Sequence, residues 1–298
     1  MLKIDVPATT TNFGSGFDAF GLALELYNTF LVKPSENWKV EVKGYTSGIP
    51  LNENNLFIRV YKRACREFGL EEKPIYLVQE NRVPPARGLG SSATAIVGGI
   101  EAALSLHGKE LPLEEKLKVA FEFEKHPDNL LPAFLGGFVI SVADQDRILY
   151  KKLPFPEELK LVFVIPDYEL STEEARKVLP QRVELRDAVF NLQRSALLVA
   201  SLLTKDYELL REAVRDKLHQ PYRSKLALGL EEAISVSYEV GALATFLSGA
   251  GPTICSITLE NEETIGKAIK EVVERFCGCK AKVKVLKALN EGVKVSKV

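Results

Sequence analysis

Residues 84–94, Pro-Pro-Ala-Arg-Gly-Leu-Gly-Ser-Ser-Ala-Thr, have the composition of a loop that wraps an anionic group and leads into a helix. Two prolines stiffen its start, and two glycines let the backbone turn and approach a ligand without a Cβ in between. Ser91 and Ser92 can cap the helix while their hydroxyls face the same ligand. The first N–H groups of a helix lack intrahelical partners, and the helix dipole is positive there. The segment therefore predicts a phosphate site.

The flanking residues place this loop between a strand and a helix. Residues 75–79 are typical of a strand, apolar residues recur at helical spacing from Ala93 to Leu104, and Gly108 is a C-terminal signal. An ordinary strand-to-helix turn is the alternative interpretation. Because such a turn does not require two adjacent serine hydroxyls after Gly-Leu-Gly, we favour the phosphate site.

Other known phosphate loops fit the segment less well. Residues 88–93 satisfy the dinucleotide pattern Gly-x-Gly-x-x-Gly/Ala, but the following helix leads to another helix start at 109–115 instead of a strand that ends in an acidic residue. A Walker loop requires Lys after its last Gly, whereas Gly90 is followed by Ser91. A protein-kinase glycine loop requires a later Asp-Phe-Gly segment, which the sequence lacks.

An acidic residue falls on the apolar face of the next expected helix. Leu113, Leu117, Ala120 and Phe121 share one face, and Glu124 lies on the same face eleven residues after the first of them. A carboxylate that points inward is costly unless it is paired, protonated or bound to a cation. Next to a triphosphate the natural cation is Mg²⁺, which takes its other oxygens from phosphate and water. The alternative is a frayed last turn that leaves Glu124 in solvent.

Three further polar segments lie where apolar elements end. Residues 9–18 form a Gly-rich loop after an N-terminal strand, residues 126–129 follow Glu124, and residues 248–253 lie between two strands. Each segment can contribute to a site. Each also has a purely structural interpretation: a capped turn at 9–18, a histidine that is hydrogen-bonded within the protein at 126–129, and a glycine turn at 248–253. The residues alone leave both interpretations open.

The pattern along the chain predicts an α+β protein in two parts. Expected strands cover 3–6, 27–32, 38–42, 75–79, 138–142, 148–150, 159–165, the surroundings of 246, 254–259 and 282–286. Expected helices cover 54–68, 93–104, 113–124, a segment opened by the capping box 171–174, 185–203, further segments to about 239, and 262–276. The Pro-rich joint at 154–156 divides the chain into an N-terminal nucleotide-binding domain, 1–155, and a C-terminal domain, 156–298.

Composition excludes several classes of protein. The 298 residues carry a net charge of −1, with acids and bases interspersed and no basic stripe, so a nucleic-acid partner is not expected. No apolar run approaches 18 residues and the N-terminus lacks a signal-peptide core, so we expect no membrane partner and a cytoplasmic protein.

The four cysteines point to no metal centre. Cys65 and Cys255 lie in apolar elements and are expected to be buried thiols. Cys277 and Cys279 flank one glycine without a second pair of cysteines, so we expect two incidental thiols in a loop.

Taken together, the motifs resemble the GHMP small-molecule kinases, over nearly the full chain and in that superfamily's order. The shared motifs are the N-terminal stretch 7–12, the loop 85–93 and the late Ser-Gly-Ala-Gly-Pro-Thr at 248–253. Finer features are similar to the branch that acts on L-homoserine: Asn12-x-x-x-Gly-Phe-Asp18, Glu124-Lys-His-Pro-Asp-Asn129 ahead of Gly136-Gly137, Ala175-Arg-Lys-Val-Leu-Pro180 and Gln220-Pro-Tyr-Arg223.

The resemblance implies a two-domain GHMP-kinase-like fold, with a left-over-type βαβ phosphate loop in the N-terminal domain and a ferredoxin-like α+β C-terminal domain. The implied reaction is ATP- and Mg²⁺-dependent phosphorylation of the side-chain hydroxyl of L-homoserine to O-phospho-L-homoserine, a step of threonine biosynthesis. A homodimer is implied as well.

The resemblance also implies a role for individual residues. ATP is expected against Asn54, Asn55, Leu56, Pro85, Arg87, Gly88, Leu89, Gly90, Ser91, Ser92 and Ala93, and Mg²⁺ on Ser92 and Glu124. L-Homoserine is expected against Asn12, Asp18, His126, Asn129, Arg176, Arg223 and Gly249, with catalytic roles for Asn12, Glu124, Asn129 and Arg176. In this scheme Asp18 meets the ammonium group, and the two arginines bind the carboxylate.

Two positions depart from the pattern of the superfamily. Lys125 replaces the usual glycine between the acid and the histidine, and it adds a cation near the phosphates. Asn129 stands where sugar and mevalonate kinases carry a catalytic Asp, so the presence of a dedicated general base is in doubt; we interpret Asp128 as a loop residue rather than a base. Phosphoryl transfer tolerates this because positioning and charge stabilisation dominate.

Two other functions are kept as alternatives. A different GHMP kinase, with a mevalonate-pathway or shikimate-type acceptor, has the same chemistry, but a mevalonate-type acceptor leaves Asp18 without an ammonium partner. A catalytically silent nucleotide-binding module predicts a damaged loop or a missing acid, and the sequence has neither.

Overall fold

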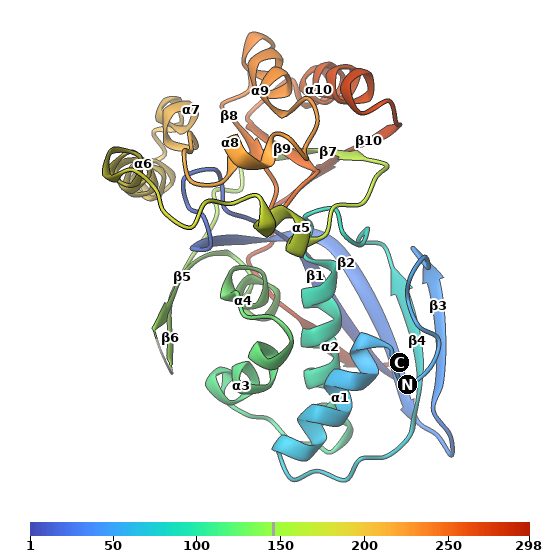
Figure 1. The fold of residues 1–298 in the computed structure, drawn as a ribbon. Helices are drawn as coiled ribbons and strands as arrows, with labels where there is room; N and C mark the ends of the chain where they lie inside the picture. The colour runs from blue at the N-terminus through green and yellow to red at the C-terminus, as the bar shows by residue number, and fades with distance from the viewer. Residues whose placement is uncertain (145–146) are drawn as a thin grey trace.

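A computed structural model describes residues 1–144 and 147–298 and has two β-sheets with helices packed on them (Figure 1). The strands are β1 Leu2–Thr11, β2 Phe20–Pro34, β3 Lys39–Gly44, β4 Ile75–Asn81, β5 Phe138–Asp144, β6 Arg147–Leu153, β7 Lys160–Pro166, β8 Ala244–Leu247, β9 Ile254–Thr258, β10 Ala281–Leu286 and β11 Lys294–Lys297. The helices are α1 Leu56–Glu67, α2 Ser91–Leu106, α3 Leu113–Phe123, α4 Pro127–Leu135, α5 Thr172–Lys177, α6 Leu185–Thr204, the 3₁₀-helix η1 Tyr207–Leu209, α7 Leu210–Ala213, α8 Gln220–Arg223, α9 Leu230–Glu239 and α10 Glu262–Cys277.

The first sheet has the strand order β11-β1-β2-β4-β3, and β5 extends it by pairing with β2 and with β6. All of its pairs are antiparallel except β3 with β4, which run parallel on either side of α1 in the chain. A parallel pair requires a crossover, and α1 supplies it. The phosphate loop follows β4 directly and leads into α2, as the sequence predicts.

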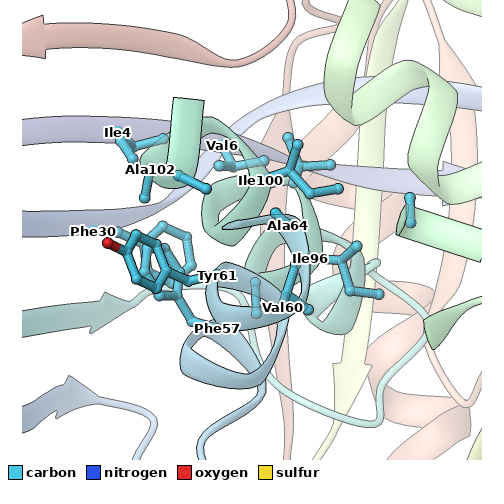
Figure 2. Close-up of a cluster of buried hydrophobic side chains, with 14 of the residues drawn as sticks. Ile4, Val6, Phe30, Phe57, Val60, Tyr61, Ala64, Ile96, Ile100 and Ala102 are labelled. Atoms are coloured by element: carbon cyan, nitrogen blue, oxygen red, sulfur yellow. The ribbon is translucent and has the colours of Figure 1, made fainter. Parts of the chain in front are cut away.

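Helices α1 to α4 cover one face of this sheet, with α2 between α1 and α4 in Figure 1. Figure 2 shows the resulting core: Phe57 and Tyr61 of α1 and Ile96 and Ile100 of α2 lie among side chains of β1 and β2. The rings of Phe30 and Phe57 stack with centroids 4.8 Å apart. Gly98 and Gly99 let α2 approach these neighbours, because a Cβ at either position would lie within 3.0 Å of them.

The second sheet, β10-β7-β9-β8, is entirely antiparallel and has two buried faces. Val164 and Ile254 point toward α9 and α10, whereas Phe163 and Cys255 point toward a core shared with the first sheet. Phe13 lies in this shared core and packs edge-on against Phe138 at 5.3 Å. Because alternate residues bury both faces of β7, β8 and β9, these strands are mainly apolar, whereas the edge strand β10 alternates with lysines and is partly exposed.

The structure corrects several expectations. β1 extends through Thr11, so the expected polar loop at 9–18 is shorter, and β2 begins at Phe20 rather than at 27. Helix α4, which contains Pro132, and the final strand β11 were not predicted. β11 pairs with β1, so residues 294–297 belong to the first sheet although they lie in the second half of the chain. Apart from these residues, the division of the chain into two domains at 155/156 stays a proposal. The capping box at Ser171 is confirmed.

The cysteine expectations are confirmed in one part and wrong in another. Cys65 and Cys255 are buried free thiols, as expected. Cys277 and Cys279 are joined by a disulfide across Gly278 at the C-terminal end of α10, whereas two separate thiols were expected. Among the helices of the described residues, none is long and apolar enough to cross a bilayer.

The loop between β1 and β2 is packed tightly against the second half of the chain. Gly14 has φ +67°, and a Cβ built on it would lie 1.7 Å from the carbonyl oxygen of Val214. Ser15 Oγ donates to the carbonyl of Ala213 at 2.7 Å, and Ser195 Oγ donates to the carbonyl of Ser15 at 2.7 Å. A side chain at Gly14 therefore has both a backbone strain and a backbone collision to overcome.

We predict that Gly14→Ala lowers the free energy of unfolding by about 3 kcal/mol or more, because the left-handed conformation and the collision with Val214 add together. Gly69→Ala is the matched control: Gly69 has φ +63°, but no atom lies within 4 Å of the position that a Cβ would take, so it should cost only about 1–2 kcal/mol. Thermal and urea unfolding of both variants measure the difference. Equal losses would contradict the assignment of a collision at Gly14.

Candidate active site

One cavity lies where α2, α4 and α5 meet the loops that join the two sheets. Its lining includes Thr11, Asn12, Asp18, Ala86, Arg87, Gly88, Leu89, Gly90, Ser91, Ser92, Ala93, Glu124, His126, Asp128, Asn129, Leu170, Thr172, Arg176, Arg223, Gly249 and Ala250. Most of the residues that were selected from the sequence therefore meet in one place. Thr11, Asp128, Leu170 and Thr172 were not selected as site residues. Thr11 ends a buried strand and Thr172 opens a short helix, positions without a local signal, and Asp128, which lies in α4, was interpreted as a loop residue.

The N-terminus of α2 opens into this cavity without a side-chain cap. Its N-cap is Gly90, in the left-handed conformation, and no side chain accepts a hydrogen bond from the first turn. The expected capping by serines is therefore wrong: Ser91 Oγ donates instead to the carbonyl of Val83 at 3.3 Å. Because the N–H groups of residues 91–93 have no intrahelical partner, they are available to an anion.

The two glycines of the loop serve protein packing as well as access. A Cβ on Gly88 would lie 2.1 Å from the carbonyl oxygen of Ser248, and one on Gly90 would lie 2.0 Å from Thr9 Oγ1. Both residues have positive φ. From the sequence these glycines were expected to permit the approach of a ligand, but the missing side chains face the protein on the other side of the loop.

A buried asparagine fixes the start of the phosphate loop. Asn28 Oδ1 accepts the backbone N–H groups of Arg82 and Val83 at 2.9 Å each. Its Nδ2 donates to Thr94 Oγ1 at 2.8 Å, and Thr94 Oγ1 donates to the carbonyl of Ser91 at 2.6 Å. The two ends of the loop are thus held by one side chain on β2, which no sequence pattern distinguishes from other strand residues.

β1 binds the phosphate loop on one side and segment 248–253 on the other. Thr9 N donates to the carbonyl of Leu89 at 3.1 Å. The hydroxyls of Thr10 and Ser248 share a hydrogen bond of 2.9 Å, and Ser248 Oγ donates to the carbonyl of Gly88 at 2.7 Å. All of these side chains are buried, so the three motifs form one hydrogen-bonded unit.

Asn12 and Asn129, both expected to contact substrate, make hydrogen bonds within the protein. Asn12 Nδ2 donates to the carbonyl of Gly249 at 2.9 Å, and its Oδ1 accepts from Asp18 N at 3.0 Å. Asn129 Oδ1 accepts from Thr9 Oγ1 at 2.6 Å. The side-chain amide of Asn12 therefore links the backbone at Asp18 to the backbone at Gly249, and the contact of Asn12 with substrate stays a prediction.

Glu124 is the C-cap of α3 with extended backbone, not a helical residue. Its expected place on a helical face is therefore wrong in detail, but the carboxylate does line the cavity. Glu124 Oε1 accepts from His126 N at 3.1 Å and from His126 Nδ1 at 2.8 Å. Burial alone would raise the pKa of Glu124, but the bonds from His126 and the charge of Arg176 lower it overall. The same bond raises the pKa of His126.

Asp18 and Arg176 pair with each other across the cavity. Arg176 Nη1 donates to Asp18 Oδ2 at 3.1 Å, and Nη2 donates to Oδ1 at 2.7 Å. Arg176 Nε is buried and has no hydrogen-bond partner. A buried guanidinium donor without an acceptor is costly, so this atom favours an anionic ligand.

Arg223 is a buried cation without a carboxylate partner. It is 1% exposed, and among the described residues no ion pair joins it to Asp or Glu. Nε donates to the carbonyl of Ala175 at 3.1 Å, and Nη1 donates to the carbonyl of Gly249 at 3.2 Å. Burial, together with the charge of Arg176, lowers the pKa of Arg223 to about 10. Such a group stabilises an anion that enters the cavity.

Five expected nucleotide contacts lie apart from this cavity or are engaged elsewhere, and Leu56 and Pro85 are two that do not line it. Asn55 is the N-cap of α1 and donates to Gln79 Oε1 at 3.1 Å, and neither Asn54 nor Asn55 lines the cavity. Arg87 lines it, but its Nη1 donates to the carbonyl of Pro85 at 2.8 Å. The contacts of these residues with the adenosine or the phosphates of ATP stay predictions.

The residues present fit a magnesium ion. Ser92 and Glu124 both line the cavity and offer hydroxyl and carboxylate oxygens, the donors that Mg²⁺ prefers. Glu124 uses Oε1 for its two bonds to His126, and Oε2 has no hydrogen-bond partner among the described residues. One carboxylate with a free oxygen, beside a helix N-terminus, suits an ion that is shared with phosphate.

Comparison with known proteins agrees with this arrangement. Residues 55–137 match the family model described as GHMP kinases N terminal domain, and residues 198–277 match GHMP kinases C terminal. The homoserine kinase of Aquifex aeolicus (strain VF5) is 70% identical over 295 residues, which are 99% of each chain. That of Persephonella marina (strain DSM 14350 / EX-H1) is 46% identical over 98% of this chain and 97% of its own.

A solved structure extends the likeness to three dimensions. The crystal structure of homoserine kinase from Cytophaga hutchinsonii ATCC 33406 superimposes with a TM-score of 0.89 at 30% sequence identity, covering 99% of this chain and 97% of that one. The chain therefore belongs to the GHMP kinase superfamily and, within it, to the homoserine kinase family.

Proposed function

We propose that this protein transfers the γ-phosphoryl group of ATP to the side-chain hydroxyl of L-homoserine, giving O-phospho-L-homoserine for threonine biosynthesis. One observation carries the proposal beyond family membership. A single cavity holds the uncapped N-terminus of α2 and the unpaired, buried guanidinium of Arg223. The first suits a phosphate, and the second suits the carboxylate of an amino acid.

We place the amino acid between α5 and α8. Its carboxylate accepts hydrogen bonds from Arg223 and from the unpartnered Nε of Arg176. Its ammonium group donates to Asp18, whose carboxylate already accepts two bonds from Arg176 and retains capacity for a third. In this orientation the side-chain hydroxyl extends toward Asn129 and the phosphate loop.

The phosphates of ATP lie against residues 88–93 in this proposal. Backbone N–H groups of α2 stabilise their negative charge, and Ser92 and Glu124 hold Mg²⁺, which neutralises charge that develops on the transferred phosphoryl group. Lys125, expected to add a cation near the phosphates, is exposed and does not line this cavity. Because the transition state is loose, the main contribution of these groups is to align the hydroxyl with the phosphorus.

Asp128 adds a further carboxylate to the cavity wall. It is 4% exposed, and its Oδ1 accepts from Asn129 N at 3.0 Å. Burial, followed by the negative charge of Asp18, raises its pKa to about 6. Near neutral pH it is therefore ionised at an energetic cost. We expected it to be an ordinary loop residue, but its position in the wall gives it an electrostatic influence on the bound amino acid.

Other features stay predictions. A homodimer, a cytoplasmic location, Mg²⁺ as the ion and the division into residues 1–155 and 156–298 follow from the resemblance and the sequence. Light scattering coupled to size-exclusion chromatography measures the mass in solution, for which the chain contributes 33.0 kDa.

We predict that the purified protein phosphorylates L-homoserine with ATP and Mg²⁺. Mevalonate and shikimate, which lack an ammonium group, should be at least about 100-fold poorer by kcat/KM, because they leave charged groups of the site unpaired. A coupled ADP-release assay with all three acceptors measures this. Turnover of mevalonate or shikimate without turnover of homoserine would overturn the proposed substrate.

We predict that Glu124→Gln lowers kcat by at least about 100-fold and raises the Mg²⁺ concentration needed for activity, because a neutral amide is a poor magnesium ligand. Glu122→Gln is the matched control: this residue lies two positions earlier and bonds to Arg63 at the surface. Circular dichroism checks that both variants are folded. An active Glu124→Gln enzyme would contradict the metal assignment.

We predict that the stability of Asp128→Asn, relative to that of the unmodified protein, rises with pH. The folded pKa of Asp128, about 6, lies above the unfolded value, so the unmodified protein loses stability as pH rises through about 6, and the amide does not. The relative gain between pH 4 and pH 8 should approach about 3 kcal/mol. Urea unfolding at several pH values measures it, with the exposed Asp206→Asn as control. A gain that does not change with pH would refute the buried, destabilised carboxylate.

A further inference from the structure

The guanidinium of Arg223 is held in one orientation by two backbone carbonyls and by the buried imidazole of His219. Nε is bound to the carbonyl of Ala175, and Nη1 is bound both to the carbonyl of Gly249 and, at 3.3 Å, to His219 Nδ1. Three of the five N–H donors of the arginine are thus engaged. The two that remain belong to Nη2, which has no hydrogen-bond partner among the described residues.

The contacts of His219 determine its tautomer. An arginine can only donate, so Nδ1 must accept and the proton must lie on Nε2. Nε2 in turn donates to the carbonyl of Gly14 at 2.8 Å. The imidazole is 0% exposed, and its Nε2 also lies 3.5 Å from Oδ2 of the buried Asp216. That carboxylate raises the pKa of His219, but burial lowers it overall. Protonation of Nδ1 would place two donors against each other and release the arginine.

An aromatic ring completes the arrangement. Phe17 stacks on His219 with ring centroids 5.0 Å apart and an interplanar angle of 19°. The guanidinium carbon of Arg223 lies 5.2 Å from the Phe17 centroid, and that of Arg176 lies 5.6 Å from it. The face of one ring therefore contacts both cations and the histidine that orients one of them.

We infer that His219 is a positioning residue for substrate recognition: its neutral imidazole, backed by Gly14 and stacked on Phe17, fixes Arg223 so that Nη2 faces the α-carboxylate of the acceptor. The inference rests on the proposed function, because it takes the carboxylate of L-homoserine as the ligand. It explains why a buried histidine is the N-cap of α8, four residues and one helical turn before the arginine that it contacts. His219 itself touches neither substrate nor phosphate in this account.

A pair of amide variants separates this role from simple packing. In Asn the amide oxygen is three bonds from Cα, as Nδ1 is in His, so His219→Asn keeps an acceptor for Arg223 and loses the donor to Gly14. In Gln the amide nitrogen is four bonds from Cα, as Nε2 is, so His219→Gln keeps the donor and loses the acceptor. Both variants lose the stacked ring, and they differ from each other in the polar group that is kept and in one methylene.

We expect His219→Gln to raise the KM for L-homoserine roughly tenfold with a smaller change in kcat and an unchanged KM for ATP, because a hydrogen bond to a charged group is lost. His219→Asn should retain a KM for homoserine within about threefold of the unmodified enzyme. His107→Gln, at the far end of α2, should change neither constant. Equal KM values for the Asn and Gln variants would overturn the inference.

A double-mutant cycle tests whether the effect passes through the arginine. In an Arg223→Met background, the replacement of His219 by Gln should change KM for homoserine by less than about twofold, because the group that it orients is gone. An additive loss would show that His219 acts independently and would also overturn the inference. If the His219 variants do not fold, Phe17→Leu replaces them: a severalfold rise in KM supports the inference, and an unchanged KM opposes it.

The same assays distinguish failure of this inference from failure of the proposed function. If the unmodified enzyme does not turn over homoserine, the proposed function fails and the inference fails with it. If the unmodified enzyme is active on homoserine and His219→Gln keeps its KM, only the positioning role is rejected.

Discussion

The hydrogen bonds from the threonines of β1 join the phosphate loop to segment 248–253, and the geometry of the cavity depends on that junction. Thr9 holds Leu89 and Asn129, and Thr10 holds Ser248, which holds Gly88. These groups come from both halves of the chain, and because Thr9, Thr10 and Ser248 are buried, water competes little for the hydrogen bonds of their side chains. A helix N-terminus is useful to a phosphate only if it does not move when charge develops, and this network holds α2 in place.

The charges of the cavity are arranged so that two groups lack partners. Asp18 is bound to Arg176, and Glu124 is bound to His126, whereas Arg223 has no carboxylate partner and Asp128 has no cationic partner within the described residues. Keeping a buried charge unpaired costs free energy in the absence of substrate. A ligand that supplies the missing charges recovers that free energy, so the empty cavity is destabilised in a way that favours binding of a charged acceptor.

The parts of this site could be predicted from the sequence, but not how they support each other. Loop 84–94 could be selected because glycine and serine have distinct chemistry near an anion, whereas Arg176 and Arg223 were selected only through the resemblance to the family. Asn28, Phe17 and His219 could not, because each is an ordinary residue until the fold places Arg82, Arg223 or Gly14 beside it. The helical position of Glu124 was wrong because α3 ends one residue earlier, yet its carboxylate still faces the cavity. Strand β11 was missed because its partner, β1, lies at the other end of the chain.

The same charges give a physical reason for an amino-acid acceptor. In the proposed arrangement a zwitterion brings one carboxylate for Arg223 and one ammonium group for Asp18, so the net charge of the cavity does not change when it binds. A hydroxy acid such as mevalonate brings a carboxylate for Arg223 but no ammonium group, so the negative charge of Asp18 and Asp128 gains no cationic partner from the ligand. Discrimination by charge is stronger than discrimination by the size of a pocket alone, because the wrong acceptor leaves a buried charge unpaired. In this proposal the specificity depends on the carboxylates as much as on the arginines, although only the arginines hold the substrate carboxylate.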